Sequence, residues 1–96
     1  VAVKNKAVVA VEALEGTDNL IRRAARIARG RGVIVKVSKP KQDMRFDIPV
    51  VGLVTVRNLI RSGLTALAIE ADKTLFIDRK ESIRLADRYG ISIVAI

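Results

Sequence analysis

The pattern of hydrophobic and polar positions alternates short apolar runs with amphipathic stretches along the whole chain. Apolar runs rich in β-branched residues predict strands. The first two, Val1–Val3 and Ala7–Val11, are joined by polar residues 4–6, which predicts a β-hairpin. A further strand is predicted at Val33–Val37, and a final buried strand at Ile91–Ile96.

Between the hairpin and the next strand, the apolar residues recur at helical spacing. Thr17 or Asp18 is a suitable N-cap for a helix that runs to about Arg29, and glycines at 30 and 32 end it. The residues expected to face inward are Leu20, Ile21, Ala24, Ile27 and Ala28. The opposite side carries Arg22, Arg23, Arg26 and Arg29. We interpret this side as a solvated face, although a basic face can also dock on an anionic membrane surface.

Two more helices are predicted in the second half of the chain. Thr55 can cap one that runs to about Arg61, where Gly63 stops it. Asp78 can cap another over Arg79–Tyr89. The apolar side of this last helix consists of Ile83, Leu85 and Ala86.

Two further apolar runs, Ala66–Ala71 and Thr74–Ile77, predict strands with a tight turn at 71–73 between them. The resulting order of elements predicts an α/β fold: a mixed β-sheet with about six short strands and three helices in a single layered domain. Ligands of such sheets bind outside the carboxyl ends of the strands.

Composition narrows the classes of function. The chain has 96 residues, half of them hydrophobic, which fits one small domain with one core. It contains no Cys and no His, which excludes a disulfide framework, a Cys/His zinc site, a thiol nucleophile and a His-based triad. No stretch resembles a signal peptide or a membrane span, so we expect a cytoplasmic protein, soluble or peripheral. The chain begins with Val in a predicted strand, so we expect a fragment of something longer.

The net charge of +8 invites an anionic partner, either a nucleic acid, a phospholipid headgroup or a phosphorylated metabolite. The alternative is that the charge only solubilises the helix faces. Nucleic acid gains little support, because the aromatic residues that would stack on bases are missing. The usual nucleotide-binding glycine motifs are also absent.

The most distinctive segment is Ser38–Pro49, which interleaves acids and bases between two prolines. Its side chains Asp43, Arg45 and Asp47 alternate, so an extended backbone points all three to one face. Two carboxylates beside an arginine suit a phosphate ligand held directly or through a divalent cation. The alternative is a surface ion-pair ladder of little energetic consequence.

A second charged segment, residues 12–18, follows the hairpin. Its candidate residues are Glu12, Glu15, Gly16, Thr17 and Asp18. It can bind an anion or a cation, but an ordinary capped helix start explains it as well. Lys36 lies inside an apolar strand, where it either faces solvent or binds phosphate. If the strands before the two charged segments are neighbours, the segments meet at one edge of the sheet.

Three stretches carry a resemblance to a known family: VVAVEALEGTDNLIRRA, VIVKVSKPKQDMRFDIPVVGLVTV and LTALAIEADKTLFIDRKESIRLADRYGISIVAI. Together they resemble the carboxy-terminal domain of bacterial UDP-2,3-diacylglucosamine pyrophosphatases of the LpxI type. The most specific pieces are the EGTD turn and the KPxQDxRxDxP loop. The alternative is a non-catalytic module that holds an anionic lipid, nucleotide or nucleic acid.

The resemblance implies hydrolysis of UDP-2,3-diacylglucosamine to lipid X and UMP in lipid A biosynthesis, with Mg²⁺ or another divalent cation. It also implies a missing amino-terminal domain that completes the site. Asp43 and Asp47 would bind the cation or activate water, and Arg45 would neutralise phosphate oxygens. The remaining substrate contacts would come from Glu12, Glu15, Gly16, Thr17, Asp18, Lys36, Lys39 and Gln42. Contact with the inner membrane surface and formation of a homo-oligomer are left open, and no nucleic acid is expected.

Overall fold

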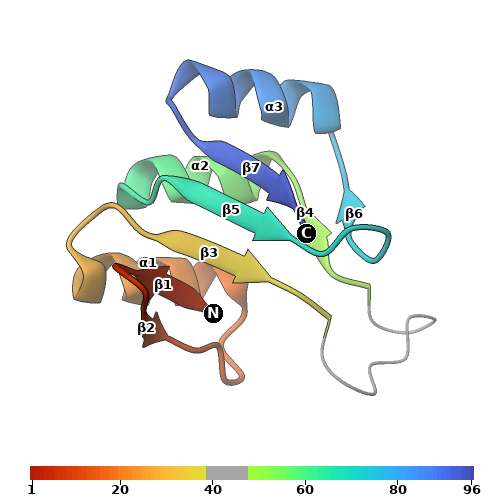
Figure 1. Cartoon of the computed structure of the whole chain (residues 1–96). Coiled ribbons are helices and arrows are strands. Elements are labelled where there is room, and N and C mark those ends of the chain that lie inside the picture. Colours follow the sequence, from red (N-terminus) through yellow and green to blue (C-terminus); the bar gives the residue numbers. More distant parts are fainter. Residues whose placement is uncertain (39–47) are drawn as a thin grey trace.

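Three helices and seven short strands make up the part of the chain that the computed structural model describes, residues 1–38 and 48–96 (Figure 1). The strands are β1 (Ala2–Lys4), β2 (Ala7–Ala10), β3 (Val33–Lys36), β4 (Val50–Val51), β5 (Ala66–Ile69), β6 (Leu75–Phe76) and β7 (Ser92–Ala95). The helices are α1 (Thr17–Ala28), α2 (Leu53–Ser62) and α3 (Arg79–Arg88). The predicted α/β class, with a mixed sheet and three helices, is confirmed.

Five strands form the main sheet in the order β2-β1-β3-β5-β7. The predicted hairpin is confirmed, since β1 pairs antiparallel with β2, and it also pairs antiparallel with β3. The strands β3, β5 and β7 are parallel to one another. Consequently β2 runs in the same direction as β3, and both end at one edge of the sheet together with β5 and β7. We call this edge the carboxyl edge.

Three strand predictions differ from the structure. The last strand is predicted to be buried, but β7 is an edge strand on which Val94 is 51% exposed. The turn at 71–73 forms, yet the strands it joins do not pair. Instead β6 pairs parallel with β4, a two-residue strand that the pattern does not predict. A strand of two residues is too short to show an alternating pattern in the sequence. It is recognised only by its pairing with β6.

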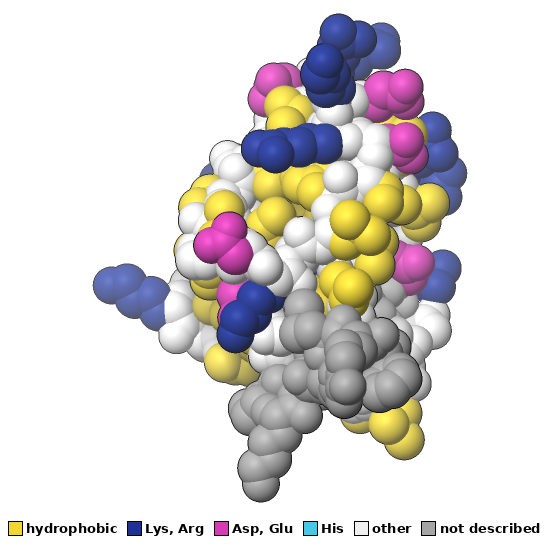
Figure 2. All heavy atoms as spheres, turned by 90° about the vertical axis from the view of Figure 1, so that its right-hand side faces the viewer, with side chains coloured by type: hydrophobic (Ala, Val, Ile, Leu, Met, Phe, Trp, Pro, Cys, Tyr) yellow, Lys and Arg dark blue, Asp and Glu magenta, His cyan; other side chains and the backbone are white. Residues whose placement is uncertain are grey.

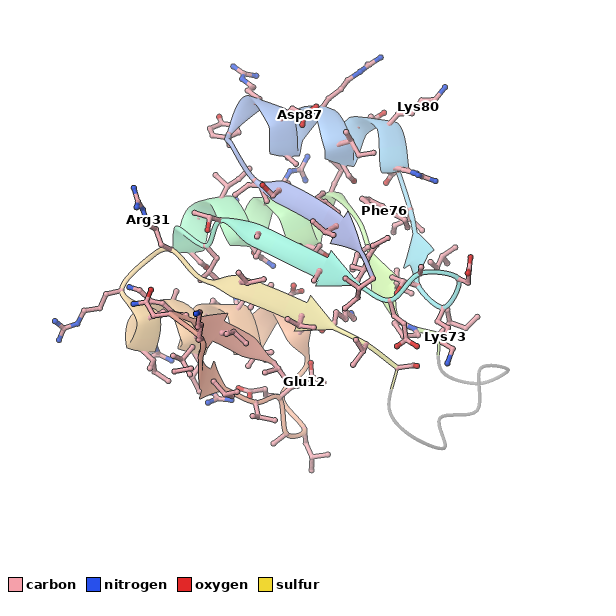
Figure 3. All side chains as sticks on the ribbon, in the orientation of Figure 1. Glu12, Arg31, Lys73, Phe76, Lys80 and Asp87 are labelled. Carbon is pink, nitrogen blue, oxygen red and sulfur yellow. The ribbon has the colours of Figure 1, made fainter. Side chains whose placement is uncertain are left out.

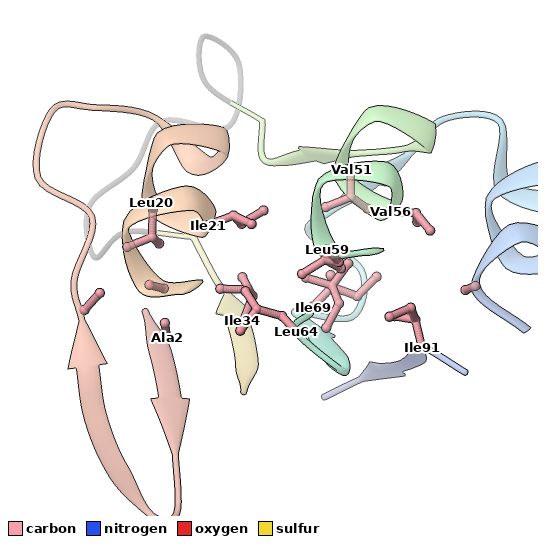
Figure 4. Close-up of a cluster of buried hydrophobic side chains, with 14 residues drawn as sticks. Ala2, Leu20, Ile21, Ile34, Val51, Val56, Leu59, Leu64, Ile69 and Ile91 are labelled. Carbon is pink, nitrogen blue, oxygen red and sulfur yellow. The ribbon is translucent and has the colours of Figure 1, made fainter. Parts of the chain in front are cut away.

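The core lies between one face of the main sheet and the helices α1 and α2 (Figure 4). Its largest fully buried hydrophobic side chains are Leu20, Ile21, Ile34, Leu59, Leu64, Leu67, Val51 and Val56. Helix α3 packs against α2 and β7 (Figure 1). Within residues 1–38 and 48–96, no helix covers the opposite face of the sheet (Figure 1), to which the strand register assigns Val33, Val35 and Val94.

Two helix starts lie at glycines rather than at the predicted side-chain caps. Gly16, not Thr17 or Asp18, is the N-cap of α1, and its φ of 85° is a conformation that favours glycine. Gly52, not Thr55, precedes α2; the Thr55 hydroxyl accepts a hydrogen bond from the Gly52 N–H at 3.3 Å. Asp78 does stand at the N-cap position of α3, but its side chain makes no cap hydrogen bond.

The predicted inward faces are confirmed in part. On α1 the side chains of Leu20, Ile21, Ala24 and Ala28 are buried, but Ile27 is 52% exposed. Ile27 lies at the margin of the apolar stripe that the buried residues of α1 form. On α3 Ala86 is buried as predicted and Leu85 is half-buried. Ile83 is exposed, because Ser82 takes the adjacent inward position and is fully buried.

Candidate functional site

A cavity of about 500 Å³ opens at the carboxyl edge, between the end of β3 and the start of α1. Glu12, labelled in Figure 3, lines it together with Thr17, Lys36 and Ser38. Glu12, Thr17 and Ser38 come from the two charged segments that the sequence singled out, and Lys36 is the charged residue inside the strand before the second of them. The strands before them are not neighbours, because β1 lies between β2 and β3. The segments meet because β2 and β3 run in the same direction and end at the same edge.

Glu12 and Thr17 are joined within this cavity. The Thr17 hydroxyl donates a hydrogen bond to Oε1 of Glu12 at 3.1 Å. Both side chains are half-buried, so the carboxylate is held in one place while it still reaches the cavity. Gly16, which precedes the helix, also lines the cavity. Among the described residues, none beyond its chain neighbours comes within 4 Å of the place that a Cβ would occupy there, so the helix start is accessible.

Glu15 does not line this cavity, because its carboxylate is bound by Arg23. The Arg23 guanidinium donates to Oε1 of Glu15 at 2.6 Å and to Oε2 at 3.2 Å, and also to the carbonyl oxygen of Val11 at 2.7 Å. These hydrogen bonds lower the pKa of the Glu15 carboxyl below its ordinary value of 4.5. Arg23 therefore fixes the loop that positions Glu12, which the interpretation of a solvated arginine face missed.

Lys36 lies on the helix-covered face of the sheet, opposite Ile69 in the register of β3 and β5. Its ammonium group donates to the carbonyl oxygen of Val50 at 2.9 Å. A smaller cavity of about 350 Å³ adjoins the first, and Lys36 and Thr17 line both. The start of α2 at Leu53 lines this second cavity as well. The ammonium group thus shares a cavity with the N-terminal ends of two helices, an arrangement that attracts anions.

Asp18 has a different position from its neighbours in the sequence. Its Oδ1 accepts a hydrogen bond from the side-chain amide of Asn58 at 2.8 Å. This bond joins the first turn of α1 to α2. Asp18 lines only the smaller of the two cavities.

Ser38, where the interleaved acidic and basic segment begins, is held by Glu70. Oε2 of Glu70 accepts from the Ser38 N–H at 2.9 Å and from the Ser38 hydroxyl at 3.1 Å. Lys73 lies 3.2 Å from Oε1 of the same carboxylate. The Ser38 N–H above all, and then Lys73, lower the pKa of Glu70 below 4.5. Sequence reasoning missed this role, because the two residues are 32 positions apart.

Five of the predicted site residues, Lys39, Gln42, Asp43, Arg45 and Asp47, lie outside the described residues, and their roles stay predictions. Among the residues that the structure does describe, no group of three or more acidic side chains could hold a metal ion. The oxygens of Glu12 and Thr17 nevertheless suit a hard cation. Mg²⁺ commonly takes one or two protein carboxylates and completes its shell with water and phosphate.

Within the same described ranges, no helix is long and apolar enough to cross a bilayer. This holds for all three helices, the longest of which has 12 residues.

Comparison with known proteins places the chain in a family. Residues 1–94 match the family described as LpxI C-terminal domain. The chain is also similar to the UDP-2,3-diacylglucosamine pyrophosphatase LpxI of Caulobacter vibrioides, with 39% identity over 97 residues. That alignment covers 93% of this chain but only 35% of the relative, so the chain spans about a third of the relative's length. The chain therefore belongs to the family of LpxI C-terminal domains.

Proposed function

We propose that this chain is the carboxy-terminal catalytic domain of an enzyme that hydrolyses UDP-2,3-diacylglucosamine to lipid X and UMP, in lipid A biosynthesis. The observation that carries the proposal is the family match over residues 1–94, together with the relative named for this activity. The cavity at the carboxyl edge supports it, because anion-binding and carboxylate groups meet there.

In the proposed reaction, water attacks the α-phosphorus of the diphosphate. The bond from this phosphorus to the bridging oxygen breaks, the bridging oxygen leaves with the sugar phosphate, and UMP takes up the oxygen of the water. Lys36 and the adjoining helix N-termini would neutralise the phosphate oxygens as charge develops. Arg45 and Lys39 would add positive charge from the neighbouring segment.

The remaining residues would hold the substrate and the cation. Glu12 and Thr17 line the cavity and would contact the sugar phosphate or complete the shell of the cation. Asp43 and Asp47 would bind Mg²⁺ or accept the proton of the attacking water. When bound, Mg²⁺ lowers the pKa of a coordinated water and neutralises phosphate charge. Glu15 would act through Arg23 on the loop that carries Glu12.

Because the chain spans about a third of its relative, we propose that the amino-terminal domain of the same protein completes the site. A cytoplasmic enzyme on the inner face of the inner membrane would have access to an acylated substrate. The basic helix faces would favour such peripheral contact.

The test is cation-dependent release of UMP by the full-length protein. Replacing Asp43 or Asp47 with alanine should lower turnover by orders of magnitude and leave the circular dichroism spectrum unchanged. Asp87→Ala, on the exposed side of α3, is the matched control and should keep normal turnover. Near-normal turnover of both active-site variants would overturn the assignment of the aspartates. Binding of UDP-sugar without release of UMP would instead indicate a non-catalytic anion-binding module.

A further inference from the structure

The cavity at the carboxyl edge has an apolar side that the proposed phosphate chemistry does not use. Four large apolar side chains line it and are nevertheless between 41% and 58% exposed. We call them the apolar wall: Val11, Val37, Ile48 and Val50. Leaving such side chains in water forgoes the free energy that their burial would contribute, so four of them in one cavity indicate a surface that another apolar group covers.

The backbone beside the apolar wall is fixed by polar contacts. The carbonyl oxygen of Val11 accepts from Arg23, and that of Val50 accepts from Lys36. Val37 lies between β3 and Ser38, and Glu70 holds Ser38. Hydrogen bonds therefore hold the backbone at or next to three of these side chains, those of Val11, Val37 and Val50.

Polar and apolar groups share one cavity. Glu12 and Thr17 follow Val11 by one and six positions, and Lys36 directly precedes Val37. All five line the cavity at the carboxyl edge. A ligand that fits this arrangement has an anionic or hydroxyl-rich head with apolar chains attached directly beside it. The face in Figure 2, which looks onto the carboxyl edge, has exposed hydrophobic side chains beside charged ones.

We infer that the apolar wall binds the acyl chains of the diacylated substrate and thereby determines acyl specificity. This inference rests on the proposed function, which supplies a sugar that carries acyl groups next to its phosphate. Binding energy from the acyl chains would then come from this chain, independently of the residues that contact the phosphates.

The experiment compares two substrates of the full-length protein, UDP-2,3-diacylglucosamine and UDP-glucosamine, which lacks the acyl chains. The variant is the double substitution Val11→Ser and Val37→Ser. We expect the KM for the acylated substrate to rise about tenfold, equivalent to about 1.4 kcal/mol, with kcat unchanged. The rate with UDP-glucosamine should not change. The control is Val8→Ser with Val94→Ser, two exposed valines (62% and 51%) that do not line the cavity.

A second measurement keeps the inference testable if UDP-glucosamine is not turned over. Calorimetric binding of diacylglucosamine 1-phosphate should weaken about tenfold in the double variant, and that of glucosamine 1-phosphate should not change. An equal loss with both ligands would overturn the inference and indicate that the apolar wall contacts the rest of the protein. An unchanged affinity for the acylated ligand would overturn it as well. Failure of the proposed function would appear separately, as absence of UMP release by the unsubstituted protein.

Discussion

Replacing Gly52 with alanine should destabilise the domain, because Ile77 approaches this glycine closely. Gly52 joins β4 to α2, and its φ of −176° is extended backbone that any residue adopts, so backbone strain plays no part. An added Cβ would lie 2.6 Å from Cγ1 of Ile77 and 3.3 Å from its carbonyl oxygen. Real Cβ atoms essentially never come as close as the first of these distances, and the second is tighter than nine in ten real contacts, so one of the two segments must shift.

The size of the expected loss of stability depends on which atoms of Ile77 can move away. The side chain of Ile77 is 46% exposed and can turn partly away, but its carbonyl oxygen belongs to a backbone that β4 holds through the bond from the Ile77 N–H to Val51. Overpacking of this kind typically costs about 1–3 kcal/mol, and we expect about 2 kcal/mol here. This is a large fraction of a total stability that for such a domain is about 5–15 kcal/mol.

Urea unfolding of four proteins, followed by circular dichroism, measures the effect as a double-mutant cycle. The four are the unsubstituted chain, Gly52→Ala, Ile77→Ala and the double variant. Removing Cγ1 and Cδ1 of Ile77 should relieve the clash, so the coupling between the two sites should be favourable by about 1 kcal/mol. If Gly52→Ala is as stable as the unsubstituted chain, or its cost is the same with alanine at 77, the steric explanation is wrong.

Three further predictions concern the core, the acid range and the phosphate site. Leu59→Ala should lower the free energy of unfolding by about 2–5 kcal/mol, because Leu59 is fully buried; a loss below 1 kcal/mol, about the cost of a surface change, would contradict this core position. The pKa of Glu70 is lowered in the folded protein, so its stabilising contribution is present above pH 4.5 and is lost as the pH falls through the folded-state pKa. The urea midpoint of unfolding should therefore fall less between neutral and acid pH in Glu70→Gln than in the unsubstituted chain. An equal fall in both proteins would argue against the hydrogen bond between Ser38 and Glu70. Lys36→Met should weaken binding of the UDP-sugar to the full-length protein by calorimetry, and unchanged affinity would exclude Lys36 from the phosphate site.

The sequence predicted the elements that their own residues determine. The hairpin and the three helices follow from local apolar spacing, and all are present. Pairing was harder to predict, because it depends on segments far apart in the chain. The strand β4 forms only beside β6, and the exposure of β7 follows from its place at the edge of the sheet. The helix starts were misassigned because threonine at 17 and 55 suits a cap, while the glycines before them take the position.

The part of the candidate site that depends on strand direction could be predicted from the sequence. Knowing only that the strands before Glu12 and Lys36 run the same way would place both residues at the carboxyl edge, and the two do line one cavity even though β1 separates their strands. The spacing of residues in the sequence could not show that the carboxylates of Glu12 and Glu15, three residues apart, occupy separate positions. Glu12 bonds to Thr17 inside the cavity, and Glu15 is taken up by Arg23 outside it. Two acidic residues close together in the sequence, such as Glu12 and Glu15, therefore do not both have to face the same ligand. In this chain the first helix pairs Arg23 with Glu15 and directs only the Thr17 hydroxyl to Glu12, so Glu12 is the carboxylate of the two that lines the cavity.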